Sequence, residues 1–332
     1  MPEEAIGFGV IGLGMGAARC KMAAGTAGAR LVAVADLSQE RREKIAAQYK
    51  VEAYGDYRPM LDRKDIAVVM VMTPSGLHGK IGKDVAAAGK HVITTKPIDV
   101  TLQNADALIA ACKKARVKLA VDFDARYAAD NHRVKEAIES GRFGKMILGE
   151  ARLKWFRSDD YFLASGGWRG TWAMDGGGSL MNQSVHWVDI LQWLMGPVEG
   201  VVGQIGVFNH KIETEDLGMA MLRFKSGAYG ALLGTTTHPV DQPARIEVHG
   251  ALGAAALENH KAVLFTIKGE PPETTPYVYK GPKNVVEDMI QVLTKGKAPE
   301  VSGEEGRKSI EIVLAVYRSA QSGRPVRLPL EA

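Results

Sequence analysis

The chain has 332 residues, of which 46% are hydrophobic and 24% charged, and its formal net charge is +4. This length suits two domains, and this composition is typical of a globular protein. Basic and acidic residues are interspersed, which argues against a nucleic-acid or membrane-surface binder. The two cysteines are too few for a disulfide framework, and we find neither a secretory signal nor an apolar run of membrane-spanning length. We therefore expect a cytoplasmic protein that binds neither nucleic acid nor membranes.

The first third of the chain alternates short apolar runs with helical segments. We expect strands at Ile6–Ile11, Leu31–Ala35, Ala67–Met72, His91–Thr94 and Lys118–Phe123, and helices at Met15–Thr26, Gln39–Tyr49, Leu77–Ala88 and Leu102–Ala115. Continuous apolar strands separated by helices are typical of a parallel sheet that is covered on both faces. Residues 1–123 are therefore predicted to form an α/β Rossmann domain with a doubly wound sheet.

The pattern changes after residue 123. Helices are expected at Asn131–Ser140, Ser179–Met195, Asn284–Thr294 and Glu304–Gln321, and a strand at Ile147–Trp155. From Val198 to Lys268 the chain reads as long strands joined by turns. We expect residues 124–332 to form one α+β domain with a large, mostly antiparallel sheet.

A glycine-rich turn lies between the first strand and the first helix. It has the pattern G-x-G-x-x-A, in which Gly12 permits a tight turn, Gly14 lets a pyrophosphate approach, and Ala17 lets helix and strand pack closely. The free N–H groups of the helix N-terminus attract phosphates. The residues predicted to bind a dinucleotide here are Gly12, Leu13, Gly14, Met15 and Gly16.

An acidic residue ends the second strand. Asp36 has the spacing from the glycines at which a carboxylate accepts hydrogen bonds from the adenosine ribose, although it could instead cap the next helix. A carboxylate there repels a 2′-phosphate and so favours NAD. Arg41 and Arg42 follow closely and leave NADP possible, with Arg41 as a further cofactor contact.

Polar residues follow the next two strands at the edge of the sheet where ligands bind. Thr73 and Pro74 end one strand, and Lys96 follows the other. All three are predicted cofactor contacts, and the Lys96 ammonium could also stabilise a developing alkoxide, unless it is an ordinary surface lysine. His78 opens the following helix, where it is either a cofactor contact or a structural histidine.

A second polar cluster falls on the predicted helix Ser179–Met195. Asn182 and His186 are four residues apart and share a face, so Asn182 could bind a sugar hydroxyl while His186 accepts its proton. Asp189 could orient the imidazole or cap a neighbouring group. A helical histidine beside Trp187 can equally be a core residue. We find no third ligand at metal-binding spacing and expect no metal.

The order and spacing of these motifs resemble the Gfo/Idh/MocA oxidoreductase family over essentially the whole chain. The motifs are GVIGLGMG, VADLS, VMTPSGLH, the pair Lys96-Pro97, DARY at Asp124–Tyr127, GGGSLMNQSVHWVDILQWLMGPV at Gly176–Val198, and YRSAQSGRPVRLP. The resemblance implies an NAD(P)-dependent enzyme that acts on CH–OH groups. It also implies an open-faced C-terminal sheet, through which we expect a homodimer or homotetramer.

The resemblance also implies roles for individual residues. Lys96 and His186 correspond to catalytic residues, and Trp168 and Arg169 to a pair near the cofactor. Asn182 occupies the position where many relatives carry a catalytic Asp, and Thr95 replaces the usual Glu before the Lys-Pro pair. Because Asn182 cannot titrate, catalysis should depend on Lys96 and His186.

The segment from residue 167 to residue 186 looks closest to UDP-N-acetylglucosaminuronate 3-dehydrogenases, which also carry Asn in place of Asp. We therefore expect oxidation of a secondary hydroxyl of a sugar, sugar acid or nucleotide sugar, with Trp155, Arg157 and Tyr161 as candidate UDP contacts. One alternative is an inositol or hexose dehydrogenase or reductase without a nucleotide-sugar substrate. Another is a non-catalytic NAD-binding regulatory or assembly protein.

Overall fold

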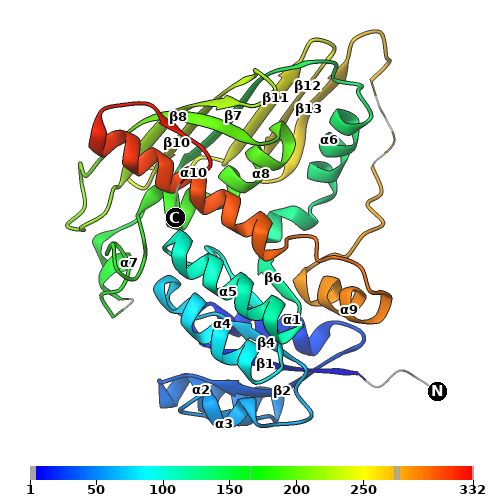
Figure 1. Cartoon of the computed structure of the whole chain (residues 1–332), viewed down its shortest axis with the longest axis vertical. Coiled ribbons are helices and arrows are strands. Elements are labelled where there is room, and N and C mark those ends of the chain that lie inside the picture. Colours follow the sequence, from blue (N-terminus) through cyan, green and yellow to red (C-terminus); the bar gives the residue numbers. More distant parts are fainter. Residues whose placement is uncertain (1–4, 165, 273–274, 276, 331–332) are drawn as a thin grey trace. The chain divides into compact units, whose positions relative to one another are not determined.

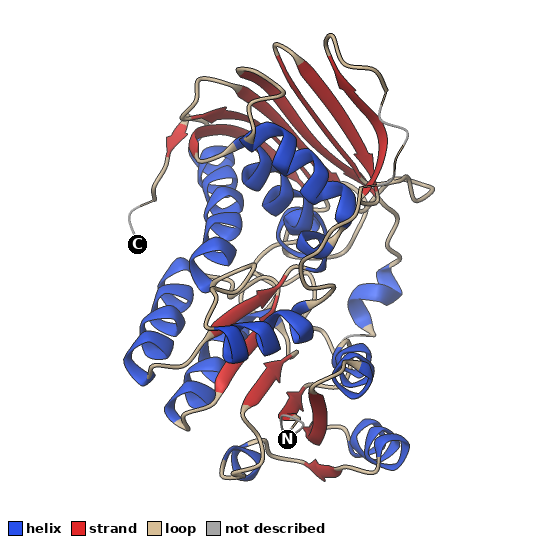
Figure 2. Ribbon diagram, turned by 90° about the vertical axis from the view of Figure 1, so that its right-hand side faces the viewer, coloured by secondary structure: helices blue, strands red, loops and turns tan. Residues whose placement is uncertain are grey.

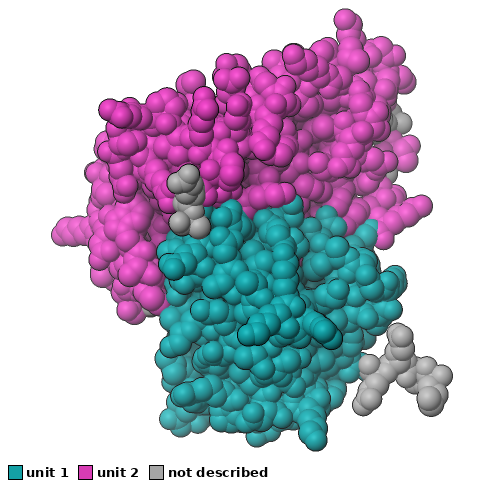
Figure 3. Space-filling view, viewed as in Figure 1, with its two compact units in different colours: residues 1–123, 281–307 teal, residues 124–280, 308–332 magenta. Residues whose placement is uncertain are grey.

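A computed structural model describes residues 5–164, 166–272, 275 and 277–330. The chain divides into two compact units (Figure 3): unit 1 comprises Met1–Phe123 and Gly281–Arg307, and unit 2 comprises Asp124–Lys280 and Lys308–Ala332. Residues 281–307 therefore group with unit 1, whereas the expected second domain ran from 124 to 332 without interruption.

Unit 1 contains the predicted doubly wound sheet. Six parallel strands lie in the order β3-β2-β1-β4-β5-β6. Their bounds are β1 Ile6–Ile11, β2 Ala29–Ala35, β3 Glu52–Tyr54, β4 Val68–Val71, β5 His91–Thr95 and β6 Leu119–Asp122. The strand order reverses between β1 and β4, which is where dinucleotides bind in folds of this type.

The helices of unit 1 are labelled in Figure 1. They are α1 Gly16–Gly25, α2 Gln39–Tyr49, α3 Arg58–Leu61, α4 His78–Ala87, preceded by the short turn η1 Ser75–Leu77, α5 Leu102–Ala115 and α9 Val285–Lys295. The Ser38 and Thr101 side chains cap α2 and α5 at their N-termini. Lys50 and Arg116 end the same helices in the left-handed conformation.

Unit 2 is built on an eight-stranded sheet, which Figure 2 shows with its helices. The strand order is β13-β12-β11-β7-β10-β9-β8-β14. The bounds are β7 Met146–Lys154, β8 Val198–Gly206, β9 Leu217–Phe224, β10 Tyr229–Thr235, β11 Arg245–Gly250, β12 Gly253–Glu258, β13 Lys261–Ile267 and β14 Val326–Arg327. Only the β7–β10 pair is parallel among these strands, so the predicted, mostly antiparallel sheet is confirmed.

One face of this sheet is covered by helices. Helix α8 (Val185–Met195) packs on β7 and β11, and α6 (Ala129–Glu139) packs on β12 and β13. The opposite face exposes apolar side chains, among them Val202, Met219, Met221 and Leu264. The remaining elements are η2 Asp124–Tyr127, α7 Asp159–Leu163, η3 Ser179–Ser184 and α10 Gly303–Ser322, which contributes to both units.

In the described part of the chain, no helix is both long enough and apolar enough to cross a membrane. The same residues include no group of three or more His, Cys, Asp or Glu side chains placed to hold a metal ion.

Candidate functional site

The glycine turn after β1 has the shape that a dinucleotide requires. Gly12 has φ +87°, and a Cβ there would lie 2.7 Å from the Met72 carbonyl oxygen. Gly14 is exposed, and nothing lies within 4 Å of the position of its missing Cβ. A Cβ on Gly16 would lie 3.2 Å from Val10 Cγ1. Buried Gly16 therefore lies at the close packing between helix and strand, while Ala17 is half-buried.

The N-terminus of α1 fits a phosphate. No side chain in the described part of the chain caps this helix, so the N–H groups of its first turn remain oriented toward the glycine turn. These groups and the helix dipole attract an anion. Together with the open space at Gly14, this arrangement fits the pyrophosphate of NAD.

Asp36 is held as a carboxylate at the end of β2. Its Oδ2 accepts from the Leu13 N–H (2.6 Å), and its Oδ1 accepts from the Ser38 N–H (2.7 Å) and from Arg41 Nη2 (3.0 Å). Burial opposes ionisation, but the hydrogen bonds from Arg41, Leu13 and Ser38 outweigh it and lower the pKa of Asp36. The carboxylate therefore stays ionised at neutral pH and also braces the glycine turn. Arg42 instead donates to the Asp36 carbonyl.

The turns after β4 and β5 are connected by His78. Its Nδ1 lies 2.7 Å from the Pro97 carbonyl oxygen and its Nε2 lies 2.8 Å from the Thr73 carbonyl oxygen. The ring is fully buried, and burial lowers its pKa against the opposing effect of these two carbonyls. Both nitrogens face backbone, so His78 braces the loops and is not placed as the direct cofactor contact we predicted. Thr73 and Lys96 are half-buried at these strand ends, as is Pro74.

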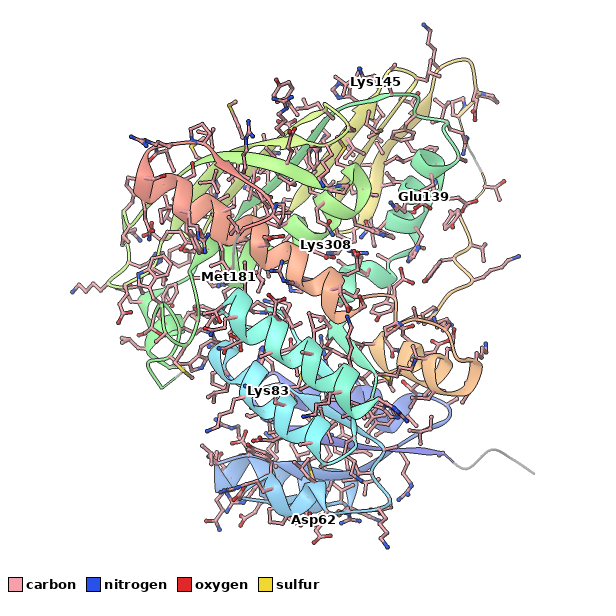
Figure 4. The ribbon with its side chains drawn as sticks, in the orientation of Figure 1. Asp62, Lys83, Glu139, Lys145, Met181 and Lys308 are labelled. Atoms are coloured by element: carbon pink, nitrogen blue, oxygen red, sulfur yellow. The ribbon has the colours of Figure 1, made fainter. Side chains whose placement is uncertain are left out.

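In unit 2, the helix that carries the second cluster begins with a π-helical turn, η3, where we expected one continuous helix. A buried carboxylate receives the N–H groups at its start: Glu215 accepts from Gly178 N (2.9 Å) and Leu180 N (2.7 Å). The Tyr317 hydroxyl donates to the same carboxylate (2.9 Å). Burial raises the pKa of Glu215 to about 7 against these hydrogen bonds. Such π turns recur at functional sites, and buried Met181 marks this one in Figure 4.

Asn182 lies in this π turn and is oriented by a carboxylate. Its Nδ2 donates to Asp175 Oδ1, while Asp175 Oδ2 accepts from the Gly170 N–H at 2.9 Å. Asp175 is almost fully buried. Because a carboxylate only accepts, these contacts fix which way the Asn182 amide points.

His186 is paired with a carboxylate that the sequence did not indicate. Its Nδ1 lies 3.3 Å from Asp124 Oδ1, at the start of η2. Asp189, which we considered as the residue that orients His186, does not do so. Its carboxylate accepts from Arg126 Nε (2.6 Å) and Nη2 (3.0 Å) and from the Ser309 hydroxyl (3.0 Å), deep in the core. Asp124 therefore takes the place that we had considered for Asp189.

Two arginines stack on aromatic rings near the π turn. The guanidinium carbon of Arg157 lies 4.8 Å from the centre of the Trp155 ring. That of Arg169 lies 4.5 Å from the Tyr161 ring and 4.9 Å from the Trp168 ring. Gln183, next to Asn182, donates to the Tyr161 hydroxyl at 3.1 Å. We call this set the guanidinium–aromatic cluster: Trp155, Arg157, Tyr161, Trp168 and Arg169.

The doubly wound sheet, its glycine turn and the ionised carboxylate after β2 define a dinucleotide-binding oxidoreductase. A family model described as an oxidoreductase family with an NAD-binding Rossmann fold matches residues 6–123. The model of the GFO/IDH/MocA C-terminal domain matches residues 131–256. The chain belongs to the Gfo/Idh/MocA family of oxidoreductases.

Its relatives include dehydrogenases of sugars and polyols. The myo-inositol 2-dehydrogenase of Thermotoga maritima is 27% identical over 338 residues, covering 97% of this chain and 98% of that protein. The NAD⁺-dependent scyllo-inositol 2-dehydrogenase of Bacillus subtilis is 25% identical, with 99% and 98% covered. The WlbA dehydrogenase of Bordetella pertussis, crystallised with NADH and UDP-GlcNAcA, is 31% identical with a TM-score of 0.90, covering 98% of this chain and 99% of that one. The chain is thus an NAD-binding oxidoreductase of a sugar and polyol dehydrogenase family.

Proposed function

We propose that the protein oxidises a secondary hydroxyl of a sugar, sugar acid or nucleotide sugar to a ketone, with Lys96 and His186 acting at the reacting hydroxyl. The observation that carries this proposal is the approach of His186 Nδ1 to within 3.3 Å of Asp124 Oδ1, a distance at which a protonated imidazole and the carboxylate form an ion pair. A proton on Nδ1 that faces the carboxylate leaves the Nε2 lone pair as the base. The carboxylate also stabilises the imidazolium that forms when this base accepts a proton.

Each residue has a separate role in this reaction. His186 takes the hydroxyl proton, and the Lys96 ammonium stabilises the oxygen while negative charge develops on it. Bound NAD⁺ would supply the acceptor for the hydride that leaves the carbon. Asn182, oriented by Asp175, binds a neighbouring hydroxyl and so positions the sugar. The substrate loses one hydride and one proton and becomes a ketone.

The same proposal assigns the cofactor contacts. The turn Gly12–Gly16 holds the pyrophosphate, and Asp36 accepts from the adenosine ribose. Thr73 and Pro74, which follow β4, and Lys96, which follows β5, are the proposed contacts of the nicotinamide half. Trp168 and Arg169 are assigned here by resemblance alone. Arg41 lies beside Asp36 with more than half of its side chain exposed, which keeps binding of NADP open.

The guanidinium–aromatic cluster supports a nucleotide sugar as the substrate. Guanidinium groups bind phosphates, and aromatic rings stack on bases and sugar faces. Arg157 supplies the positive charge, and the rings of Trp155 and Tyr161 lie 4.8 Å and 5.6 Å from its guanidinium carbon. The UDP-GlcNAcA in the Bordetella pertussis WlbA structure favours the same class, whereas the inositol dehydrogenases favour a free polyol.

The exposed face of the unit 2 sheet supports a homodimer or homotetramer. Val202, Met219 and Met221 are 46%, 50% and 63% exposed there, and contiguous apolar surface of this kind is typical of an interface. Light scattering of the purified protein should give a multiple of the chain mass, and Met221→Lys should lower that mass.

The function is tested by incubating the protein with UDP-sugars, free hexoses or inositols and either NAD or NADP. Absorbance of the reduced cofactor measures turnover, and thermal shift measures binding. We expect NAD reduction with a UDP-sugar. Arg157→Ala should raise KM for the UDP-sugar and leave KM for NAD unchanged. The control Arg324→Ala, an exposed residue that follows α10, should change neither. Stabilisation by NAD without any reduction would favour the non-catalytic alternative. Turnover of free polyols alone would favour an inositol-type dehydrogenase.

A further inference from the structure

The hairpin turn between β12 and β13 has a backbone conformation that its sequence does not favour. Glu258 pairs with Lys261, so the turn consists of Asn259 and His260 alone. Their φ angles are 45° and 67°, and both are therefore left-handed. Turns of this kind favour Asn-Gly, because a side chain with a Cβ is strained in that conformation. A histidine at the second position is therefore expected to make contacts that offset this strain.

The His260 ring stacks on a residue next to the proposed base. Its ring centre lies 5.6 Å from that of Trp187, with an angle of 17° between the planes. Trp187 is the next residue after His186 in α8, and those two rings meet edge to face at 5.8 Å. Trp187 is almost fully buried, so His260 covers the aromatic ring against which the imidazole of His186 packs.

His260 is also connected to Asp124, the carboxylate beside His186, through Asn131 and the backbone of Ala125. The fully buried Asn131 donates from Nδ2 to the Ala125 carbonyl (2.7 Å), and the same nitrogen lies 3.3 Å from His260 Nδ1. Because a carbonyl only accepts, Nδ2 is a donor, and His260 Nδ1 is therefore the acceptor. Ala125 follows Asp124, whose carboxylate faces His186. His260 thus reaches both groups that surround the proposed base.

This geometry requires a neutral His260 ring. A proton on Nδ1 would set two donors against each other at Asn131. Burial lowers the pKa of His260, and the nearby carboxylate of Asp124 opposes that effect. The charged and titratable groups around the turn include Glu258 and Lys261, which flank it, Asp124 on η2, His186 on α8, and Asp130 on α6, which accepts from the Ala262 N–H at 2.8 Å.

The turn is held from both sides, which explains how the left-handed conformation persists. Asn259 Oδ1 accepts from the Ala244 N–H at 3.1 Å, and the Asn259 N–H donates to the Ala244 carbonyl at 2.9 Å. Asp130 holds the strand that follows. Strained residues survive where the surroundings fix them in this way, and they concentrate at functional sites.

We propose that His260 is a positioning residue of the active site, which fixes His186 through Trp187 on one side and through Asn131, Ala125 and Asp124 on the other. The inference rests on the proposed function, in which His186 is the base. A turn shaped by stability alone would carry glycine at this position. The histidine instead supplies a ring for Trp187 and an acceptor for Asn131.

Three substitutions separate these contributions. His260→Gly relieves the backbone and removes both contacts. His260→Phe keeps a ring but has no acceptor for Asn131. His260→Asn tolerates the left-handed conformation and serves if the glycine variant does not fold. Arg116→Gly is the matched control, because Arg116 is an exposed residue in unit 1 with φ 57°.

We expect His260→Gly to melt at or above the wild-type temperature while kcat falls about tenfold or more, since misplacement of a base costs rate, and KM for NAD stays unchanged. His260→Phe should lose kcat in the same direction. Arg116→Gly should raise the melting temperature at wild-type kcat. A His260→Gly or His260→Asn enzyme with kcat within about twofold of wild type would overturn the inference.

A second measurement does not need a substrate. The titration of the His186 imidazole is followed by NMR in the wild type, in His260→Phe and in Arg116→Gly. We expect its midpoint to move in His260→Phe only, because Asn131, which donates to the Ala125 carbonyl beside Asp124, loses its contact with His260 Nδ1. An unchanged midpoint of the His186 titration would show that His260 does not position His186, even if the enzyme oxidises a sugar. If the midpoint moves but the protein oxidises no sugar, His260 does position His186 and the proposed function is wrong.

Discussion

Replacing Glu215 by glutamine should remove a large pH-dependent contribution to the stability of unit 2. The Glu215 carboxyl is almost fully buried and accepts three hydrogen bonds, from two backbone N–H groups and the Tyr317 hydroxyl. Burial raises its pKa from 4.5 to about 7. This shift corresponds to roughly 3 kcal/mol between the two protonation states.

The sign of the effect follows from the raised pKa. The folded state binds the Glu215 proton more tightly than the unfolded chain does, so the stabilising contribution is fully present below about pH 4.5 and is lost as the pH rises through about 7. Between pH 5 and pH 8, wild type should therefore lose up to roughly 3 kcal/mol of stability relative to Glu215→Gln. Tyr317→Phe removes a donor to the carboxylate and should move this window to higher pH.

Urea unfolding followed by tryptophan fluorescence measures this difference in unit 2 alone. All five tryptophans lie between residues 155 and 193. Glu139→Gln, on an exposed position of α6, is the control for loss of a carboxylate. Stability curves of wild type and Glu215→Gln that stay parallel from pH 5 to pH 8 would refute the reasoning.

Three further predictions concern the cofactor turn and the core. Asp36→Ser should weaken NAD binding by about 1.5–3 kcal/mol in calorimetry, because hydrogen bonds to a charged group are lost, and should improve NADP relative to NAD; unchanged selectivity would argue against a ribose contact. Gly12→Ala should lower the melting temperature and abolish NAD binding, since its Cβ would meet the Met72 carbonyl oxygen at 2.7 Å; normal NAD affinity would contradict this. Asp189→Asn should cost about 3–5 kcal/mol of unfolding free energy, because Arg126 stays buried without its counter-charge. A loss below about 1 kcal/mol would mean that water reaches that pair.

Much of unit 1 could be predicted because its signals are local. The β4 strand is a continuous apolar run, as a strand covered on both faces must be. Helices α2 and α5 have the predicted bounds, since the side chains of Ser38 and Thr101 mark their N-termini in the sequence. The glycine turn and Asp36 were recognisable from their spacing alone.

The features that were missed depend on contacts between distant residues. Asp189 is one turn from His186 on α8, but the buried Arg126 competes for its carboxylate. Asp124 lies far from His186 in the sequence and reaches it only after folding. The π turn forms where Glu215, in the loop before β9, accepts the first N–H groups of the helix. No local pattern records such partners, and the same holds for residues 281–307 in unit 1.

The central claim is that Lys96 and His186 act on one hydroxyl, and single-turnover hydride transfer in Lys96→Met, His186→Ala and the double variant tests it most directly. We predict wild-type affinity for NAD in all three and a loss of about 10²–10⁴-fold in each single variant. The double variant should be little slower than the slower single one, because residues that act as a unit are not additive. Full hydride transfer in either single variant would contradict the account.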